Sequence, residues 1–175
     1  MTNHKANQAR WLFSRTLHYS CKNVIMKAGE KMGKNNFRIA INLIVKKGEK
    51  VLLLRRFNTG WNDGKYALMG GHVEDGENPE DAVVREAYEE LGIVVDKKDI
   101  VYKRTMIVEP DHVYLYYECE KYSGEPTIAE PDQCDDLRFF DIANLPENLI
   151  AADKKSLAAI YGNDPASYGI LGWGL

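Results

Sequence analysis

Short apolar runs separated by turn residues occupy the middle of the chain and predict β-strands. The predicted strands span residues 38–45, 50–55, 100–108, 112–120 and 137–140. A connection containing Gly48 joins the first two, and one containing Pro110 joins the next two, so each pair is predicted to form a hairpin. Near the end of the chain, residues 153–161 have helical spacing, with Leu157 and Ile160 facing inward. The pattern therefore predicts a mixed sheet and a closing helix.

Another helix is predicted in the middle of the chain, between Pro79 and Gly92. Asn78 suits the N-cap, and Pro79 suits the first helical position, where its missing N–H costs nothing. Gly92 suits the left-handed residue that ends a helix. The residues that can form its apolar side are Ala82 or Val83, Ala87 and Leu91. This side should anchor the helix on the sheet.

Three acidic residues share one face of the same predicted helix. Glu86, Glu89 and Glu90 stand at positions i, i+3 and i+4, which places their Cβ atoms about 5 to 6 Å apart. Like charges at this spacing repel, so the cluster is either solvated or holds a hard cation. Mg²⁺ is the natural candidate because it takes oxygen ligands and shares its shell with substrate phosphates. Gly70 and Gly71 precede the helix and allow a close backbone approach to a ligand.

Composition narrows the class of protein. With 175 residues, of which 45% are hydrophobic and 28% charged, the chain is long enough for one domain with a real core. No apolar run reaches the roughly 18 residues of a membrane helix, so no membrane span is expected. The cysteines are odd in number and lack metal-type spacing, which favours free thiols and a cytoplasmic location. They are Cys21, Cys119 and Cys134.

The first 36 residues differ in charge from the rest. They hold seven Lys or Arg and one acid, a net charge of +6, which leaves −9 for residues 37–175 because the whole chain carries −3. We expect residues 1–36 to be a basic extension, either a docked helix or disordered. A contact with nucleic acid or with a membrane surface is the other interpretation.

The segment from Gly71 to Ile93 resembles the Nudix box. The residues that occupy its specified positions are Gly71, Glu77, Arg85, Glu86, Glu89, Glu90, Gly92 and Ile93. So many positions at fixed spacing are hard to match by chance. The chain departs from the pattern at Ala87, which is usually a larger aliphatic residue, and at Met69, which is often proline. The resemblance covers residues 37–149 and implies an α+β fold, an α/β/α sandwich with a mixed β-sheet between helices.

The resemblance also implies roles for individual residues. Glu77 and Arg85 are expected to pair and to orient the loop against the helix. A divalent metal is expected, Mg²⁺ or alternatively Mn²⁺. Its expected ligands are the Gly70 carbonyl, Glu86, Glu89 and Glu90. Glu74 is a weaker ligand candidate, and His72 is expected to shape the loop because Mg²⁺ prefers oxygen.

The reaction of the family is hydrolysis of a nucleoside diphosphate linked to another group, X. For this chain the resemblance favours a MutT-like enzyme that cleaves a nucleoside triphosphate, intact or damaged, to a monophosphate and pyrophosphate. The attack of water needs a general base. Glu130 is one candidate, because it follows a Gly-Glu-Pro turn at residues 124–126 that resembles the MutT segment, and Glu89 is the other. The alternatives are a nucleotide-sugar or dinucleotide pyrophosphatase, a nucleotide-binding sensor without activity, and a metal-stabilised structural element.

The substrate pocket is less well defined by the sequence. A base pocket needs an aromatic or apolar wall and a few polar groups. The candidates for substrate binding are Phe57, Trp61, Tyr66 and Asp132, followed by Tyr114, Tyr116 and Asp135. We expect a nucleotide-type small molecule as the partner and no stable nucleic acid partner, with a homodimer left open. The predicted division is the extension at 1–36, a catalytic domain at 37–150, and a helix and tail of the same domain at 151–175.

Overall fold

The computed structural model describes residues 37–108, 110–162 and 167–172. The strands are β1 (Arg38–Lys47), β2 (Lys50–Arg56), β3 (Tyr66–Ala67), β4 (Met69–His72), β5 (Val94–Val95), β6 (Val101–Val108), β7 (His112–Cys119), β8 (Tyr122–Ser123), β9 (Cys134–Asp141) and β10 (Tyr168–Leu171). The helices are α1 (Pro79–Leu91) and α2 (Ala151–Tyr161), with 3₁₀ turns η1 (Lys97–Asp99) and η2 (Ile142–Asn144).

The main sheet is mixed and runs in the order β10-β6-β7-β1-β2-β3, with β4 paired to β1 and β9 paired to β2. β1 pairs with β7 in parallel, as β10 does with β6, and the remaining pairs are antiparallel. β1 therefore pairs with three strands: β7 along most of its length, β4 at residues 40–43 and β2 at its end. This long shared strand connects the two ends of the sheet.

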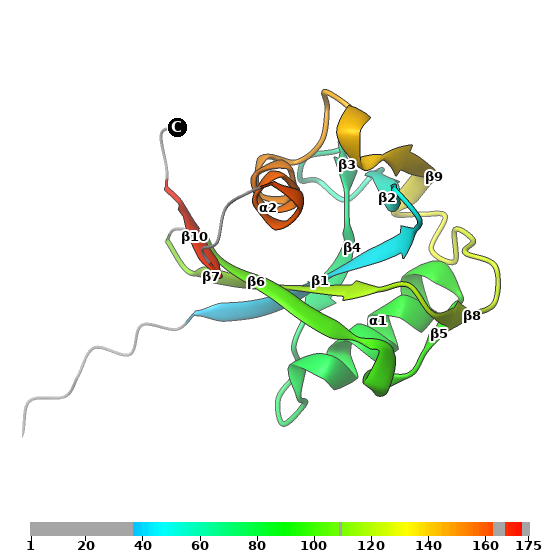
Figure 1. Cartoon of the computed structure of the whole chain (residues 1–175), viewed down its shortest axis with the longest axis horizontal. Helices are drawn as coiled ribbons and strands as arrows, with labels where there is room; N and C mark the ends of the chain where they lie inside the picture. Colours follow the sequence, from blue (N-terminus) through cyan, green and yellow to red (C-terminus); the bar gives the residue numbers. More distant parts are fainter. Residues whose placement is uncertain (1–36, 109, 163–166, 173–175) are drawn as a thin grey trace, which may run out of the picture. The chain divides into compact units, whose positions relative to one another are not determined.

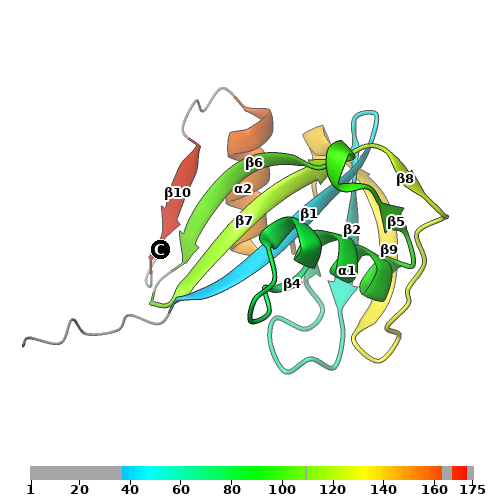
Figure 2. The same cartoon turned by 90° about the horizontal axis from the view of Figure 1, so that it is seen from below.

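The two long helices cover opposite faces of the strands β1, β6 and β7, as Figures 1 and 2 show. Ala82, Val83, Ala87 and Leu91 of α1 are buried in one apolar cluster. Leu157 of α2 is buried in a second cluster, and Ile160 packs against that cluster. The predicted fold, an α+β sandwich with a mixed sheet between helices, is confirmed.

The local signals of α1 are also confirmed. The helix begins at Pro79, and Gly92 ends it with φ 67°, where its N–H bonds back to the last turn. Asn78 is the N-cap residue by position, but its side chain does not cap the helix. Its amide group donates to Asp81 Oδ2 instead, at 3.2 Å. The helix start thus depends on proline and the acidic first turn more than on a capping hydrogen bond.

Both predicted hairpins are present, as β1–β2 and β6–β7. β9 is longer than the predicted strand, α2 begins two residues before the predicted helix, and β10 was not predicted. Residues 1–36, predicted to be a basic extension, lie outside the described residues. Among the described helices, none is long and apolar enough to cross a membrane.

Candidate active site

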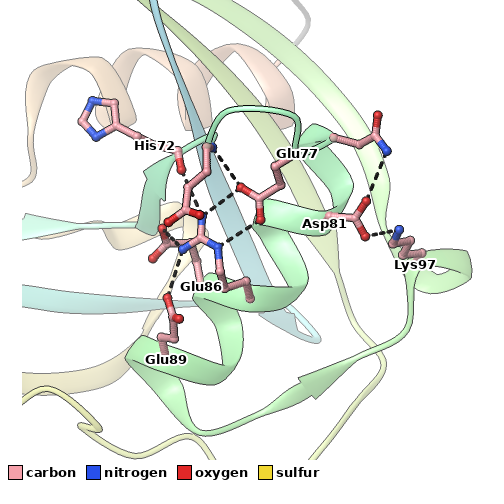
Figure 3. A network of polar contacts seen from close by, with 9 residues as sticks. His72, Glu77, Asp81, Glu86, Glu89 and Lys97 are labelled. Atoms are coloured by element: carbon pink, nitrogen blue, oxygen red, sulfur yellow. Dashed lines mark hydrogen bonds and ion pairs between the residues drawn. The ribbon is translucent and has the colours of Figure 1, made fainter.

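Arg85 connects the acidic side chains of α1 to the loop that precedes the helix. Figure 3 shows Glu77, Glu86 and Glu89, which belong to this network of polar contacts. Its Nε and Nη2 each donate to one carboxylate oxygen of Glu77, both at 3.0 Å. Its Nη1 donates to Glu86 at 2.7 Å and to Glu89 at 3.0 Å, and its Nη2 also reaches the carbonyl of His72 at 3.0 Å. The predicted pair of Glu77 and Arg85 is therefore present, in a bidentate form that fixes the loop to the helix. The hydrogen bond from Arg85 lowers the pKa of Glu77.

The two glycines of β4 are needed because the chain is packed tightly on both sides of them. A Cβ atom at Gly70 would overlap the carbonyl oxygen of Ile41 on β1. A Cβ atom at Gly71 would overlap the carboxylate of Glu86. The Gly70 N–H donates to Glu90 Oε2 at 3.2 Å. The glycine pair thus lies directly against two of the predicted metal ligands.

Glu90 is the most perturbed acid of this group. Burial raises its pKa to about 8, and the nearby charges of Glu86 and Glu130 act in the same direction. Burial likewise raises the pKa of Glu86, although its ion pair with Arg85 opposes the shift. Carboxylates that are desolvated and close together favour protonation, or a cation that offsets their charge.

A small cavity brings Glu130 to the carboxyl end of α1. Thr127 N–H donates to Leu91 O at 3.0 Å and Ala129 N–H donates to Glu90 O at 3.1 Å, so the loop before β9 is hydrogen-bonded to the last turn of the helix. The residues that line the cavity are Leu54, Arg56, Thr59, Glu90, Leu91, Ile128, Glu130, Gln133, Cys134 and Leu137. Glu130 and Glu90 therefore share one cavity, as a metal site that includes the downstream glutamate requires.

Arg56 is a cavity residue that the sequence analysis missed. It ends β2, and its side chain donates to the Trp61 carbonyl and to Thr59 Oγ1, both at 2.9 Å. Its guanidinium lies 5.0 Å from the centre of the Trp61 ring. A single arginine at the end of a strand is not a recognisable sequence motif. Only the packing of the loop after β2 shows that Arg56 lines the cavity. In that position it can contact an anionic ligand.

The predicted substrate-binding residues are not brought together. Phe57 and Trp61 are exposed, at 47% and 53%, on the loop after β2. Asp132 is exposed and does not line the cavity. Tyr66 is buried, and its hydroxyl donates to Asp136 of β9. The ring of Tyr66 thus packs in the core and its hydroxyl has a partner within the fold, and its assignment to substrate binding stays a prediction.

The additional candidates also have structural partners. Tyr116 is fully buried in the core beneath α2, and Tyr114 is half-buried beside it on the same strand. Asp135 forms an ion pair with Arg55, with a distance of 2.7 Å. Of the cysteines, Cys119 and Cys134 are free and buried, as expected, while Cys21 lies outside the described residues.

The donors around Gly70 suit a hard divalent cation, because they are carboxylates and a peptide carbonyl. In the part of the chain that the structure describes, no three His, Cys, Asp or Glu side chains are grouped closely enough to hold a metal ion as they stand. Arg85 accounts for this, since it holds Glu86 and Glu89 while Glu90 turns to the Gly70 amide. The assignment of Gly70, Glu86, Glu89 and Glu90 as ligands stays a prediction.

The fold and the acidic helix define a class of enzyme that hydrolyses phosphoric anhydrides. The chain matches the model of the NUDIX domain over residues 36–160 and therefore belongs to the Nudix family. The predicted family and the predicted pyrophosphohydrolase class are thereby confirmed. Members of the family generally use divalent metal ions.

Individual relatives differ in the substrates that their names give. The chain is 34% identical over 126 residues to an ADP-ribose pyrophosphatase of Methanocaldococcus jannaschii, which covers 70% of this chain and 72% of the relative. It is 32% identical over 106 residues to the NAD-capped RNA hydrolase NudC of Pseudomonas putida, but it spans only 36% of the length of that relative. Among solved structures, a MutT NUDIX hydrolase from Burkholderia pseudomallei is 29% identical, with a TM-score of 0.63 over 69% of this chain and 95% of the other.

Proposed function

We propose that this enzyme hydrolyses the diphosphate bridge of a nucleoside diphosphate joined to a second group, with Mg²⁺ or Mn²⁺ as the cofactor. The observation that carries this proposal is the packing of Glu86 and Glu90 against Gly70 and Gly71, beside a cavity that also contains Glu130. This arrangement gathers oxygen donors where a backbone can approach a phosphate closely.

The residues would divide the work of hydrolysis among them. A divalent metal on Glu86, Glu89, Glu90 and the Gly70 carbonyl would supply charge neutralisation at the phosphates. Arg56, which also lines the cavity, would bind a phosphate oxygen. Glu130 or Glu89 would accept a proton from the attacking water. Arg85 and Glu77 would keep the glycine loop in place.

A substrate of the ADP-ribose type is our first choice. It is supported by the relative with the highest sequence identity among those compared above, 34%, which is an ADP-ribose pyrophosphatase. A nucleoside triphosphate is the second choice. It is supported by the similarity to a MutT hydrolase, because this chain matches that protein over 95% of its length. Dinucleotide substrates come third, because the NAD-capped RNA hydrolase is matched over a minority of its length.

A substrate panel tests this order. ADP-ribose, NADH, nucleotide sugars and nucleoside triphosphates are each incubated with the enzyme and Mg²⁺. Alkaline phosphatase then releases phosphate from the monoester products of the bridged substrates, and inorganic pyrophosphatase reports triphosphate cleavage. We expect the strongest signal with ADP-ribose and a much weaker one with Glu89→Gln. A signal only with pyrophosphatase would move triphosphates to first place, and silence across the panel would favour a sensor.

A further inference from the structure

Asp153 is a buried acid on the first turn of α2, on the face of the sheet opposite α1. The residue is only 3% exposed. Each carboxylate oxygen has one donor from another element. Leu68 N–H donates to Oδ2 and the Tyr116 hydroxyl donates to Oδ1, both at 3.0 Å. The side chain therefore ties α2 to two separate parts of the sheet and does not cap its own helix.

Leu68 lies where the chain changes its strand partner. The residue before it, Ala67, pairs with Leu54 on β2, and the residue after it, Met69, pairs with Leu43 on β1. Leu68 belongs to neither pairing. The carboxylate of Asp153 supplies the acceptor that this buried amide needs at the crossover.

The start of α2 and the residues just before it also hold the chain that precedes Leu68. Tyr66 N–H donates to Asn148 O at 3.0 Å, and Ile150 N–H donates to Tyr66 O at 2.9 Å. Three hydrogen bonds thus join the start of α2 and the residues before it to residues 66–68. Asp153 makes the last of these and the one nearest to the glycine pair.

Gly70 is two residues beyond Leu68 and has little freedom to move. It lies against Ile41 O on one side, and its N–H bonds to Glu90 on the other. A shift of Leu68 would therefore change the fit of β4 against α1. We propose that Asp153 is a positioning residue for hydrolysis, which holds the Leu68 amide and through it sets Gly70 and Gly71 against Glu86 and Glu90. This inference rests on the proposed site.

The chemistry of the position supports a role beyond stability. Tyr116 and Leu157, which belong to the apolar cluster at this face, are fully buried. Burial raises the pKa of Asp153 to about 6, so the charge is unfavourable there at neutral pH. Buried ionic groups are often replaceable by apolar ones without loss of stability, and holding a group in one position is a reason to retain them.

Three variants of the full chain test the proposal. Asp153→Leu removes both acceptors at similar volume. Asp153→Asn keeps an acceptor for Leu68, because its Nδ2 can donate to the Tyr116 hydroxyl. Tyr116→Phe removes the other partner and leaves the bond to Leu68 intact. Turnover on the best substrate of the panel and the affinity for Mn²⁺ alone are measured for each, together with thermal unfolding.

We expect Asp153→Leu to lower kcat by about tenfold or more, because small displacements of catalytic groups have effects of this size. Its KM should change much less, and its Mn²⁺ affinity should fall. Asp153→Asn and Tyr116→Phe should keep most of the wild-type kcat. A folded Asp153→Leu with wild-type kcat and Mn²⁺ affinity would overturn the proposal, as would Asp153→Asn if it lost activity like the leucine variant.

Amide hydrogen exchange decides the matter if Asp153→Leu does not fold. In Asp153→Asn, retained kcat should accompany retained protection of the Leu68 and Gly70 amides. Loss of protection at both amides with unchanged kcat would refute positioning. If the wild-type enzyme hydrolyses nothing in the panel, the proposed function fails separately, and the Mn²⁺ affinities of the variants still test the role of Asp153.

Discussion

Glu90 combines a buried carboxyl group with acidic neighbours, so its negative charge is unfavourable until a cation offsets it. Glu90→Gln removes the charge but keeps an oxygen acceptor for the Gly70 N–H. We expect this variant to unfold at a higher temperature than wild type in metal-free buffer. Its kcat should fall on the order of 100-fold, the size found when one preorganised electrostatic contact is lost. Thermal unfolding and turnover check both changes, with Glu125→Gln at an exposed position as the control. Wild-type turnover in Glu90→Gln would exclude Glu90 as a metal ligand.

Glu89 and Glu130 compete for the role of general base, and the structure gives them different surroundings. Glu89 is half exposed and paired with Arg85, whereas Glu130 lines the cavity and accepts from Gln133 Nε2 at 3.1 Å. The glutamine variant of the true base should lose about 100- to 10,000-fold in kcat and lose the acid limb of the pH–rate profile. Glu89→Gln should lose most turnover whether Glu89 is the general base or a metal ligand. Only loss of the acid limb in this variant would identify Glu89 as the base. An unchanged acid limb in both variants would mean that another group takes the proton.

At the scale of elements, β4 shows how tightly the glycine loop is built. Gly70→Ala would force a methyl group against the backbone of Ile41, which cannot move aside, whereas Gly71→Ala would meet only the flexible end of Glu86. We expect Gly70→Ala to lower the free energy of unfolding by about 1–3 kcal/mol, because the added methyl group overpacks the site. Gly71→Ala should fold nearly as well as wild type but lose about 100-fold in turnover because Glu86 is displaced. Urea unfolding and turnover of the two variants test this, and equal stability in both would contradict it.

The same elements show what the sequence could predict. The limits of α1 and its buried side follow from local signals, namely Pro79, Gly92 and the helical spacing of apolar residues, and all were predicted correctly. The cavity depends on hydrogen bonds between segments that are distant in sequence, such as the one from Ala129 to Glu90. Arg56 and Asp153 carry no local signature, because their importance comes only from the partners that the fold brings to them. The bond from the Tyr66 hydroxyl to Asp136 of β9 could not be predicted for the same reason.

At the scale of the whole molecule, the two faces of the sheet have different tasks. The α1 face carries the acidic residues and the glycine loop, and the α2 face contains the bonded pair of Asp153 and Tyr116 beside an apolar cluster. β4 and the residues before it are bonded to both helices, through Glu90 and Asp153. The stability of the α2 face should therefore influence the geometry of the active face.

The buried carboxyl group of Asp153 should also give the fold a characteristic dependence on pH. Its pKa is raised from 3.8 to about 6, mainly by burial, while the hydrogen bonds from Leu68 and Tyr116 and the charge of Arg56 oppose the shift. The folded state thus binds this proton more tightly than the unfolded state, so the unfolding free energy falls as pH rises from about 4 to about 6. The loss from this one group should reach about 3 kcal/mol above that window.

Asp153→Asn should abolish this contribution, while other acids titrate alike in both proteins. Urea unfolding of wild type and variant at several pH values gives the difference in unfolding free energy between them. We expect this difference to move in favour of the variant as pH rises from 4 to 7 and then to stay level. A difference that does not change with pH would mean that Asp153 keeps an ordinary pKa, and a change in the opposite direction would mean that its hydrogen bonds outweigh its burial.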